Sequence, residues 1–259
     1  TALIGTNVRI AGPNTAISVN DTVLWMGQEN FYLYDGRIQT IPCSVREYVF
    51  NDINRNQSFK FFSGSLSSNS EVWWYYCSES SDEIDRYVIY NYLEKVWYYG
   101  TLTRTAWNDR GAGNRLFPQA PGTDGVLYNH ENGLDDGSQN PPVAINAFVQ
   151  SADFDIGDGQ QFMLMNRVIP DLNFSDSVAS APQVTFTMGA RNYNGSAAQT
   201  TENGNVIRSS VVSGTDNYTE QVQMRLRGRQ MNLKVESNTT GVKWRLGNPR
   251  LDVRPDGRR

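Results

Sequence analysis

Short apolar strands separated by tight turns make up the first half of the sequence, and they occur in a repeated order. Aligning Trp25 with Trp74 and Tyr34 with Tyr90 shows two copies of one pattern. Each copy has an apolar strand, a polar loop, a strand that ends in an aromatic residue, and a return strand, read as YDGRIQTI in one copy and YNYLEKVWYYG in the other. Aromatic and β-branched runs bounded by Asp-Gly or Asn-containing turns favour antiparallel strands.

A third, weaker copy is predicted from GVLYNHENGLDDGS to AINAFVQSADFDIGDGQQFMLMNRVIPDL. Repeats of about 45 to 60 residues with four short strands each are typical of β-propeller blades. Three blades cannot close a ring of four or more. We therefore expect residues 1–174 to form part of a propeller whose N-terminal blades lie outside this sequence, and the start at Thr1 in place of Met agrees with a piece of a longer protein.

The sequence changes character after Phe174. SDSVASAP, residues 175–182, indicates a linker, and residues 183–259 indicate further antiparallel strands. In QVQMRLRGRQMNLKVES apolar and polar residues alternate almost strictly, which predicts half-buried strands with a basic exposed face. Because no convincing amphipathic helix is present, the predicted class is all-β, with propeller blades followed by a C-terminal antiparallel β-sandwich-like domain.

Charge is divided unevenly along the chain. From Met224 to Arg259 there are ten Lys and Arg against three acidic residues, whereas the preceding 223 residues carry 24 acidic against 13 basic. Such an asymmetry favours an acidic partner or phosphate, and no element shaped to read bases is visible. We assign subunit or partner contacts to seven residues: Arg225, Arg227, Arg229, Lys243, Arg245, Arg250 and Arg254.

Three aspartates, Asp153, Asp155 and Asp158, lie close together in the stretch SADFDIGDGQ. An EF-hand loop counted from Asp153 would need a glutamate at its twelfth position, where the chain has Leu164. A looser calcium turn and a glycosidase carboxylate pair are weaker interpretations of the same residues. We favour the turn of a hairpin, because Asp binds its own backbone and glycine supplies positive φ. No metal site is assigned.

His130, in YNHENG, is the only histidine, so a histidine-based catalytic set would have to include it. Its neighbours indicate a surface turn, and we expect a solvated side chain. P-loop, dinucleotide-binding and HExxH motifs are all missing from the sequence. No catalytic residue and no cofactor are predicted, and the sequence has no apolar run of the roughly 18 to 20 residues that cross a bilayer.

The remaining candidates receive structural interpretations. Cys43 and Cys77 are expected to be reduced thiols, with a disulfide as the alternative. The aromatic residues are expected to form blade core and an interface, with a sugar- or base-stacking platform as the alternative; they are Trp73, Trp74, Tyr75, Tyr76, Trp97, Tyr98 and Tyr99. Six glycosylation sequons are attributed to chance; they begin at Asn20, Asn56, Asn173, Asn194, Asn217 and Asn238.

Three stretches resemble the tail hub or nozzle proteins of short-tailed bacteriophages, also called phage stabilisation proteins. They are VLWMGQENFYLYDGRIQTIPCSVREYVF, FDIGDGQQFMLMNRVIPDL and MRLRGRQMNLKVESNTTGVKWRLGNPRLDVRPDGRR. The resemblance implies a β-propeller carried on further β domains, in six copies that form a ring at the distal end of the tail tube. It also implies assembly in the host cytoplasm, a place in the virion tail, and no active site.

The partners implied by the resemblance are other tail proteins, namely the adaptor or tube and the fibres, and genomic double-stranded DNA that passes through the channel without sequence recognition. Strong Lys and Arg contacts would retard a sliding polyanion by Coulombic attraction. We therefore expect acidic surface to face the channel and the C-terminal arginines to serve subunit contacts.

Two hypotheses from other classes remain open at this point. The first is a carbohydrate-binding or sialidase-like glycoside hydrolase propeller that uses Asp153, Asp155 and the tryptophans. The second is a secreted adhesion module stabilised by calcium. The surroundings of the two aspartates discriminate between these hypotheses and the assembly role.

Overall fold

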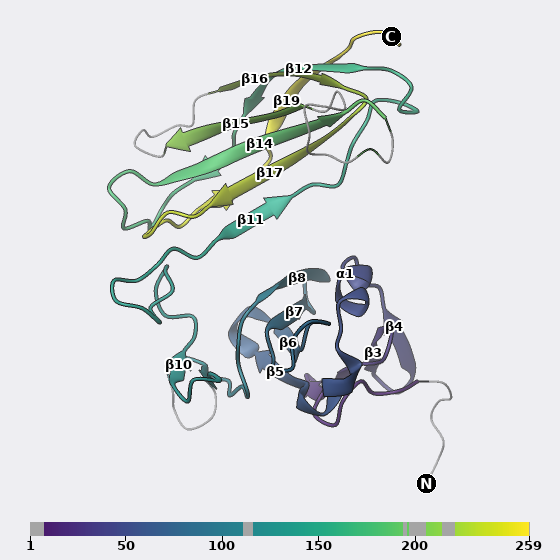
Figure 1. Cartoon of the computed structure of the whole chain (residues 1–259), viewed down its shortest axis with the longest axis vertical. Helices are drawn as coiled ribbons and strands as arrows, with labels where there is room; N and C mark the ends of the chain where they lie inside the picture. The colour runs from purple at the N-terminus through teal and green to yellow at the C-terminus, as the bar shows by residue number, and fades with distance from the viewer. Residues whose placement is uncertain (1–7, 111–115, 194–195, 197–205, 214–220, 259) are drawn as a thin grey trace. The chain divides into compact units, whose positions relative to one another are not determined.

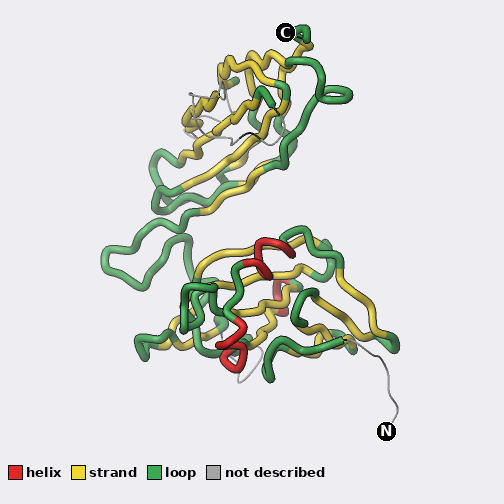
Figure 2. The backbone as a smooth tube through the Cα atoms, turned by 45° about the vertical axis from the view of Figure 1, so that its right-hand side comes forward, coloured by secondary structure: helices red, strands yellow, loops and turns green. Residues whose placement is uncertain are grey.

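The computed structural model describes five parts of the chain: residues 8–110, 116–193, 196, 206–213 and 221–258. Strands predominate throughout these parts, and the short helices all precede the ninth strand (Figure 2). The all-β class predicted from the sequence is therefore confirmed. Within the described residues, no helix has the length and apolar character needed to cross a membrane. The chain divides into two compact units, Thr1–Asn132 and Gly133–Arg259.

The first unit contains two four-stranded antiparallel sheets, each with its strands in chain order. The first sheet consists of β1 (Ala16–Val19), β2 (Thr22–Met26), β3 (Phe31–Tyr34) and β4 (Ile38–Ile41). The second sheet consists of β5 (Phe62–Leu66), β6 (Glu71–Tyr76), β7 (Arg86–Asn91) and β8 (Val96–Thr101). Each of the two sequence copies thus forms one sheet. Three short helices join or cap them: α1 (Arg46–Asn51), η1 (Arg55–Lys60) and η2 (Ser67–Asn69).

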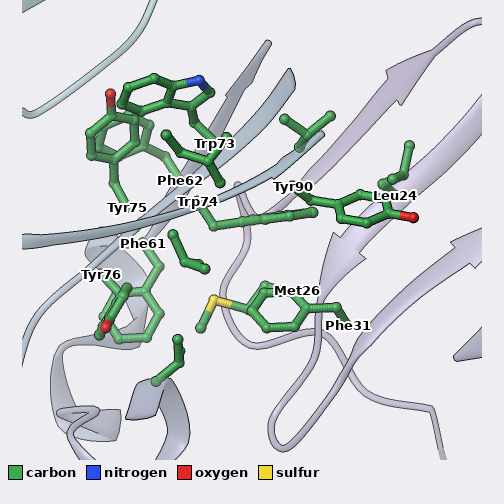
Figure 3. Close-up of a cluster of buried hydrophobic side chains, with 14 of the residues drawn as sticks. Leu24, Met26, Phe31, Phe61, Phe62, Trp73, Trp74, Tyr75, Tyr76 and Tyr90 are labelled. Atoms are coloured by element: carbon green, nitrogen blue, oxygen red, sulfur yellow. The ribbon is translucent and has the colours of Figure 1, made fainter. Parts of the chain in front are cut away.

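The aromatic run of β6 explains how the two sheets pack. Successive side chains alternate between the two sides of the strand, so Trp74 and Tyr76 lie on one side and Trp73 and Tyr75 on the other (Figure 3). The Trp74 ring lies 5.0 Å from that of Phe31 in the first sheet, and its Nε1 donates to the Thr15 carbonyl at 2.9 Å. The predicted aromatic core is confirmed for these residues.

The aromatic residues of β8, the outer strand of the second sheet, belong only in part to the predicted aromatic core. Trp97 packs on the core, with its ring 6.1 Å from that of Trp74. Tyr98 and Tyr99 are 44% and 37% exposed, because β8 is an edge strand with a neighbour on one side only. Tyr99 instead contacts Tyr48 of α1, with the two rings tilted and their centres 4.1 Å apart.

The second unit has two main sheets whose buried side chains form one cluster. One sheet has the order β11-β17-β14-β15, with β11 (Ala147–Gln150), β14 (Gln183–Arg191), β15 (Val206–Ser213) and β17 (Gln230–Ser237). The other has the order β16-β12-β19, with β12 (Met163–Ile169), β16 (Val222–Gly228) and β19 (Arg250–Pro255) (Figure 1). A two-stranded ladder adds β13 (Leu172–Asn173) and β18 (Arg245–Leu246).

The division between the units corrects the boundaries expected from the sequence. We placed blades over residues 1–174, a linker over 175–182 and a C-terminal domain over 183–259. In the structure, residues 133–174 belong to the second unit, because β11 pairs with β17 and β12 lies between β16 and β19. The expected linker also belongs there, since the Ser177 hydroxyl donates to the Lys243 carbonyl at 2.8 Å.

The third predicted blade does not form. Its first part supplies β10 (Leu127–Asn129), which pairs in the first unit with β9 (Gln119–Pro121), a strand that precedes the predicted copy. Its second part supplies β11 and β12 to different sheets of the second unit. By this arrangement β12 has a neighbouring strand on both sides, β16 and β19. A hairpin with β11 would leave one edge of that apolar strand open.

Candidate interaction surface

The three-stranded sheet of the second unit separates apolar from charged side chains. Val222, Met224 and Leu226 of β16 are buried, and so are Met163, Met165 and Val168 of β12. The alternate side chains point to the opposite side of the sheet. We call this side the arginine face, and its residues are Gln223, Arg225, Arg227, Leu164, Arg167, Ile169, Arg250, Asp252 and Arg254.

Strand register sets the rows of the arginine face. Leu164 lies between Arg227 and Arg254, and Arg167 lies between Gln223 and Asp252. An irregularity between Met165 and Arg167 allows β12 to keep apolar residues inward on both sides of the shift. The basic exposed face that the alternation predicted is confirmed for β16, and it extends over β12 and β19. The outward side of β17 does not continue it, because Lys234 there forms an ion pair with Glu236.

Asp252 is the acidic centre of this surface. Its carboxylate lies 3.3 Å from Arg167 Nε and 3.6 Å from Arg254 Nε. Arg227 forms an ion pair with Asp256, just beyond β19, and its guanidinium lies 3.8 Å from the centre of the Phe162 ring. Ion pairs exposed to this extent stabilise a fold by only about 0 to 1 kcal/mol each. The arginines can therefore exchange these internal partners for carboxylates of another molecule at little cost.

Arg225 and Arg250 differ from the other arginines of the face. Both are exposed, and neither side chain has a hydrogen bond or an ion pair within the described part of the chain. Arg225 lies on β16 and Arg250 on β19, on opposite sides of β12. Two strand spacings of about 4.8 Å separate the backbones of these strands by about 10 Å. These two guanidinium groups are available to an anionic partner.

The other predicted contact residues have different positions. Arg229 lies after the end of β16, so it does not continue the strand face as the spacing predicted; its guanidinium lies 4.9 Å from the Phe162 ring centre. Lys243 forms an ion pair with Asp176 at 3.0 Å, which lowers the pKa of that carboxyl. Arg245 is exposed on β18, outside the arginine face. A contact role for all seven residues stays a prediction.

The aspartate stretch connects two sheets. Asp153 forms an ion pair with Arg191 at 3.0 Å and accepts a hydrogen bond from Asn232 Nδ2 at 2.7 Å. Asp158 Oδ1 accepts from the Gln160 backbone N–H at 3.1 Å. Gly157 and Gly159 have φ of 71° and 73°. The predicted turn is present, but it links β11 to β12 in different sheets, so the predicted hairpin is wrong.

Metal ligation has no visible basis in the described residues, which contain no group of three or more His, Cys, Asp or Glu placed to hold an ion. Asp155, the third candidate, is exposed, and a Cβ added at Gly159 would lie 2.9 Å from its Oδ2. Of the three aspartates, Asp153 and Asp158 have partners that hold the turn.

His130 is not the solvated loop residue that its neighbours indicated. Its Nε2 accepts a hydrogen bond from Arg104 Nε at 2.9 Å, and its ring lies 4.9 Å from that of Trp107. Burial, together with the positive charge of Arg104, lowers the pKa of His130 to about 4. The histidine is therefore neutral near pH 7 and acts as an acceptor for a buried arginine.

The two cysteines are free, as predicted, with Cys77 buried and Cys43 partly buried. Burial raises the pKa of each thiol to about 11. Both are consequently protonated near pH 7, which disfavours nucleophilic chemistry.

Sequence reasoning missed several residues that shape these surfaces. Arg167 and Asp252 escaped notice because each is a single charge within an apolar strand, and only the pairing of β12 with β19 brings them together. Arg104 and Trp107 were missed because no local pattern links them to His130. The alternation in QFMLMNRVI was the one available signal for the arginine face. It predicts that Leu164 points to the opposite side of the sheet from its buried neighbours, Met163 and Met165.

Comparison with known proteins yields little. No family model matches this sequence, and no curated protein matches it. Among solved structures, a weak likeness is found to an exo-β-1,3-galactanase from Phanerochaete chrysosporium with β-1,3-galactotriose: 10% identity over 91% of this chain and 67% of that chain, with a TM-score of 0.22. A second structure of the enzyme, with galactose, gives 11% identity over 95% of this chain and 57% of that chain, with a TM-score of 0.20. TM-scores this low carry no argument about function.

Proposed function

We propose that this chain is a structural component of a short-tailed phage virion. It is one subunit of a nozzle ring at the distal end of the tail, which is a conduit and closure for genome DNA during ejection. The arginine face is the observation that carries the proposal. It is a charged surface on a three-stranded sheet, and two of its guanidinium groups have no partner among the residues that the structure describes. Arginine is enriched at contacts between proteins. The sequence resemblance supports the same role.

The proposal includes the finer fold assignment, in which the two sheets of the first unit are neighbouring propeller blades. Their first strands lie side by side, joined by a parallel bridge between Asn14 and Phe62 and by a hydrogen bond from Ser63 N to the Asn14 carbonyl at 2.8 Å. Adjacent blades of a propeller meet in this way around the central channel.

The first sheet also has an apolar side that points away from the second sheet. Its residues alternate with the buried ones and are only partly covered; they are Val23, Trp25, Tyr32, Tyr34 and Ile38. Trp25 and Tyr32 stack there with ring centres 5.5 Å apart. A further sheet of the same kind would bury this side, as the second sheet buries the other, which supports membership of a larger propeller.

Passage of DNA requires a wall that does not retain it. A duplex carries one negative charge for about every 1.7 Å of its axis, so an arginine-lined wall would bind it. The excess of acidic residues before Met224 is suited to the wall of the channel. The arginine face is suited to contacts between subunits.

Native mass spectrometry of the purified full chain tests the proposal. The expected result is an assembly of six copies, stable at moderate ionic strength. A monomer at every protein concentration from about 1 to 100 µM, a range that covers typical subunit affinities, would argue against a ring-forming subunit.

A further inference from the structure

The pattern of charges on the arginine face distinguishes between kinds of anionic partner. Its five arginines come from three strands: Arg225, Arg227, Arg167, Arg250 and Arg254. Asp252 lies among them and is bound to Arg167 and Arg254. Two of the surrounding positions, Leu164 and Ile169, are apolar, and Ile169 is 38% exposed. The surface is therefore mixed in character, with a basic excess.

A nucleic acid fits this pattern poorly. Phosphate groups follow one another without interruption along a duplex, so a strand laid across the face would bring phosphates against the Asp252 carboxylate. Surfaces that bind phosphate backbones are also much more positive than protein–protein interfaces. The apolar positions at Leu164 and Ile169 have nothing to contact on a phosphate backbone.

A protein surface with discrete carboxylates fits better. Arginine binds a carboxylate through two parallel N–H donors, and this geometry suits isolated Asp or Glu side chains. Arg225 and Arg250 provide two such positions on opposite sides of β12, and Leu164 and Ile169 provide apolar contact area near them. Interfaces between proteins combine these two kinds of contact.

We infer that the arginine face binds an acidic surface of a second copy of this chain, with Arg225 and Arg250 each receiving a carboxylate. The chain before Met224 supplies the complementary charge, with 24 acidic against 13 basic residues. Two arginine faces repel each other, so the contact joins two different surfaces. Contacts of that type produce rings or filaments, whereas self-complementary contacts produce two-fold dimers. The inference rests on the proposed ring and names the surface that builds it.

The test compares two double charge reversals in the full chain. Arg225→Glu with Arg250→Glu changes the arginine face, and Arg37→Glu with Arg55→Glu makes the same change in net charge at exposed positions outside it. Assembly is measured by sedimentation velocity over a range of protein and salt concentrations, and thermal melts confirm folding. The face variant is expected to associate about a hundredfold more weakly than the wild type, because each reversal places like charges together. The control variant is expected to assemble normally.

Four outcomes are informative. Weaker assembly of the face variant alone, with a wild-type assembly that also weakens as salt rises, supports the inference. Equal assembly of both variants would overturn it and leave the ring itself standing. A wild-type chain that never associates would overturn both the inference and the proposed function. Binding of a 30-base-pair duplex, at the order of affinity of non-specific DNA binding and lost in the face variant, would overturn the assignment to a protein partner.

Discussion

At the scale of single residues, buried polar groups are held by specific partners that local sequence does not reveal. Arg104 is 9% exposed and donates to His130, and its guanidinium lies 4.3 Å from the centre of the Tyr128 ring. An arginine this deeply buried needs an acceptor for its N–H groups. Neutral histidine supplies one, because its unprotonated Nε2 accepts while the other ring nitrogen donates.

The Arg104–His130 contact predicts a pH dependence of stability. His130 has a pKa of about 4 in the folded chain and about 6.5 when unfolded. The unfolded chain therefore binds a proton first as pH falls, and stability decreases from about pH 6.5 down to about pH 4, by up to about 3 kcal/mol. Urea unfolding of wild type and His130→Gln at several pH values checks this. Glutamine keeps an acceptor but does not titrate, so its profile is expected to be flatter, and parallel profiles would contradict the assignment.

Asp153 gives a second prediction at this scale. Asp153→Ala removes the ion pair with Arg191 and the hydrogen bond from Asn232. The free energy of unfolding is expected to fall by about 1 kcal/mol, as is usual for partly exposed polar contacts. Asp155→Ala is the matched control, since Asp155 has no such partner among the described residues. Chelation by EDTA is expected to leave the melting temperature unchanged, and a fall of several degrees would favour the calcium-stabilised module.

At the scale of elements, local patterns predicted the sheets whose strands are neighbours in sequence. The aromatic alternation around Trp74 and the turn after Tyr34 sufficed to identify the last three strands of each meander in the first unit, but not the first strands, β1 and β5. The strand Met163–Ile169 was assigned to the wrong sheet, because its partners begin at Val222 and Arg250. Pairing over such separations leaves no trace in a short window of sequence, and the same is true of the contact between Arg167 and Asp252.

Trp107, in the loop after β8, packs against the side of the second sheet that faces away from the first sheet. Its ring stacks on that of Trp73 at 5.3 Å, and its Nε1 donates to the Ser65 carbonyl at 2.8 Å. Gly64 provides the space, because a Cβ added there would lie 2.4 Å from the Trp107 ring. The glycine is therefore required for close packing of the loop against β5.

Gly64→Ala is expected to destabilise the chain by roughly 1 to 3 kcal/mol, because the added methyl overpacks this contact. Gly137→Ala is the control, since a Cβ there meets no atom within 4 Å and its φ is not positive. The control is expected to stay within about 0.5 kcal/mol of the wild type. Chemical denaturation followed by tryptophan fluorescence measures the free energy of unfolding of both variants. Equal values for the two variants would show that the packing of Trp107 does not require glycine at position 64.

At the scale of the whole molecule, the chain consists of two β units, and the proposed function assigns a contact surface to each of them. One unit has an apolar sheet side around Trp25 suited to a further sheet, and the other has the arginine face suited to carboxylates. The carbohydrate-active hypothesis required Asp153 and the tryptophans to form one site. Asp153 is held by the side chains of Arg191 and Asn232, and the carbohydrate-active hypothesis stays an untested alternative.

Images of the purified assembly by electron microscopy test the central claim most directly. The proposed function predicts a ring with six-fold symmetry and an open channel wide enough for a DNA duplex. The further inference predicts that Arg225 and Arg250 lie at contacts between subunits. Single particles the size of one chain, or a ring with these arginines lining the channel, would contradict it.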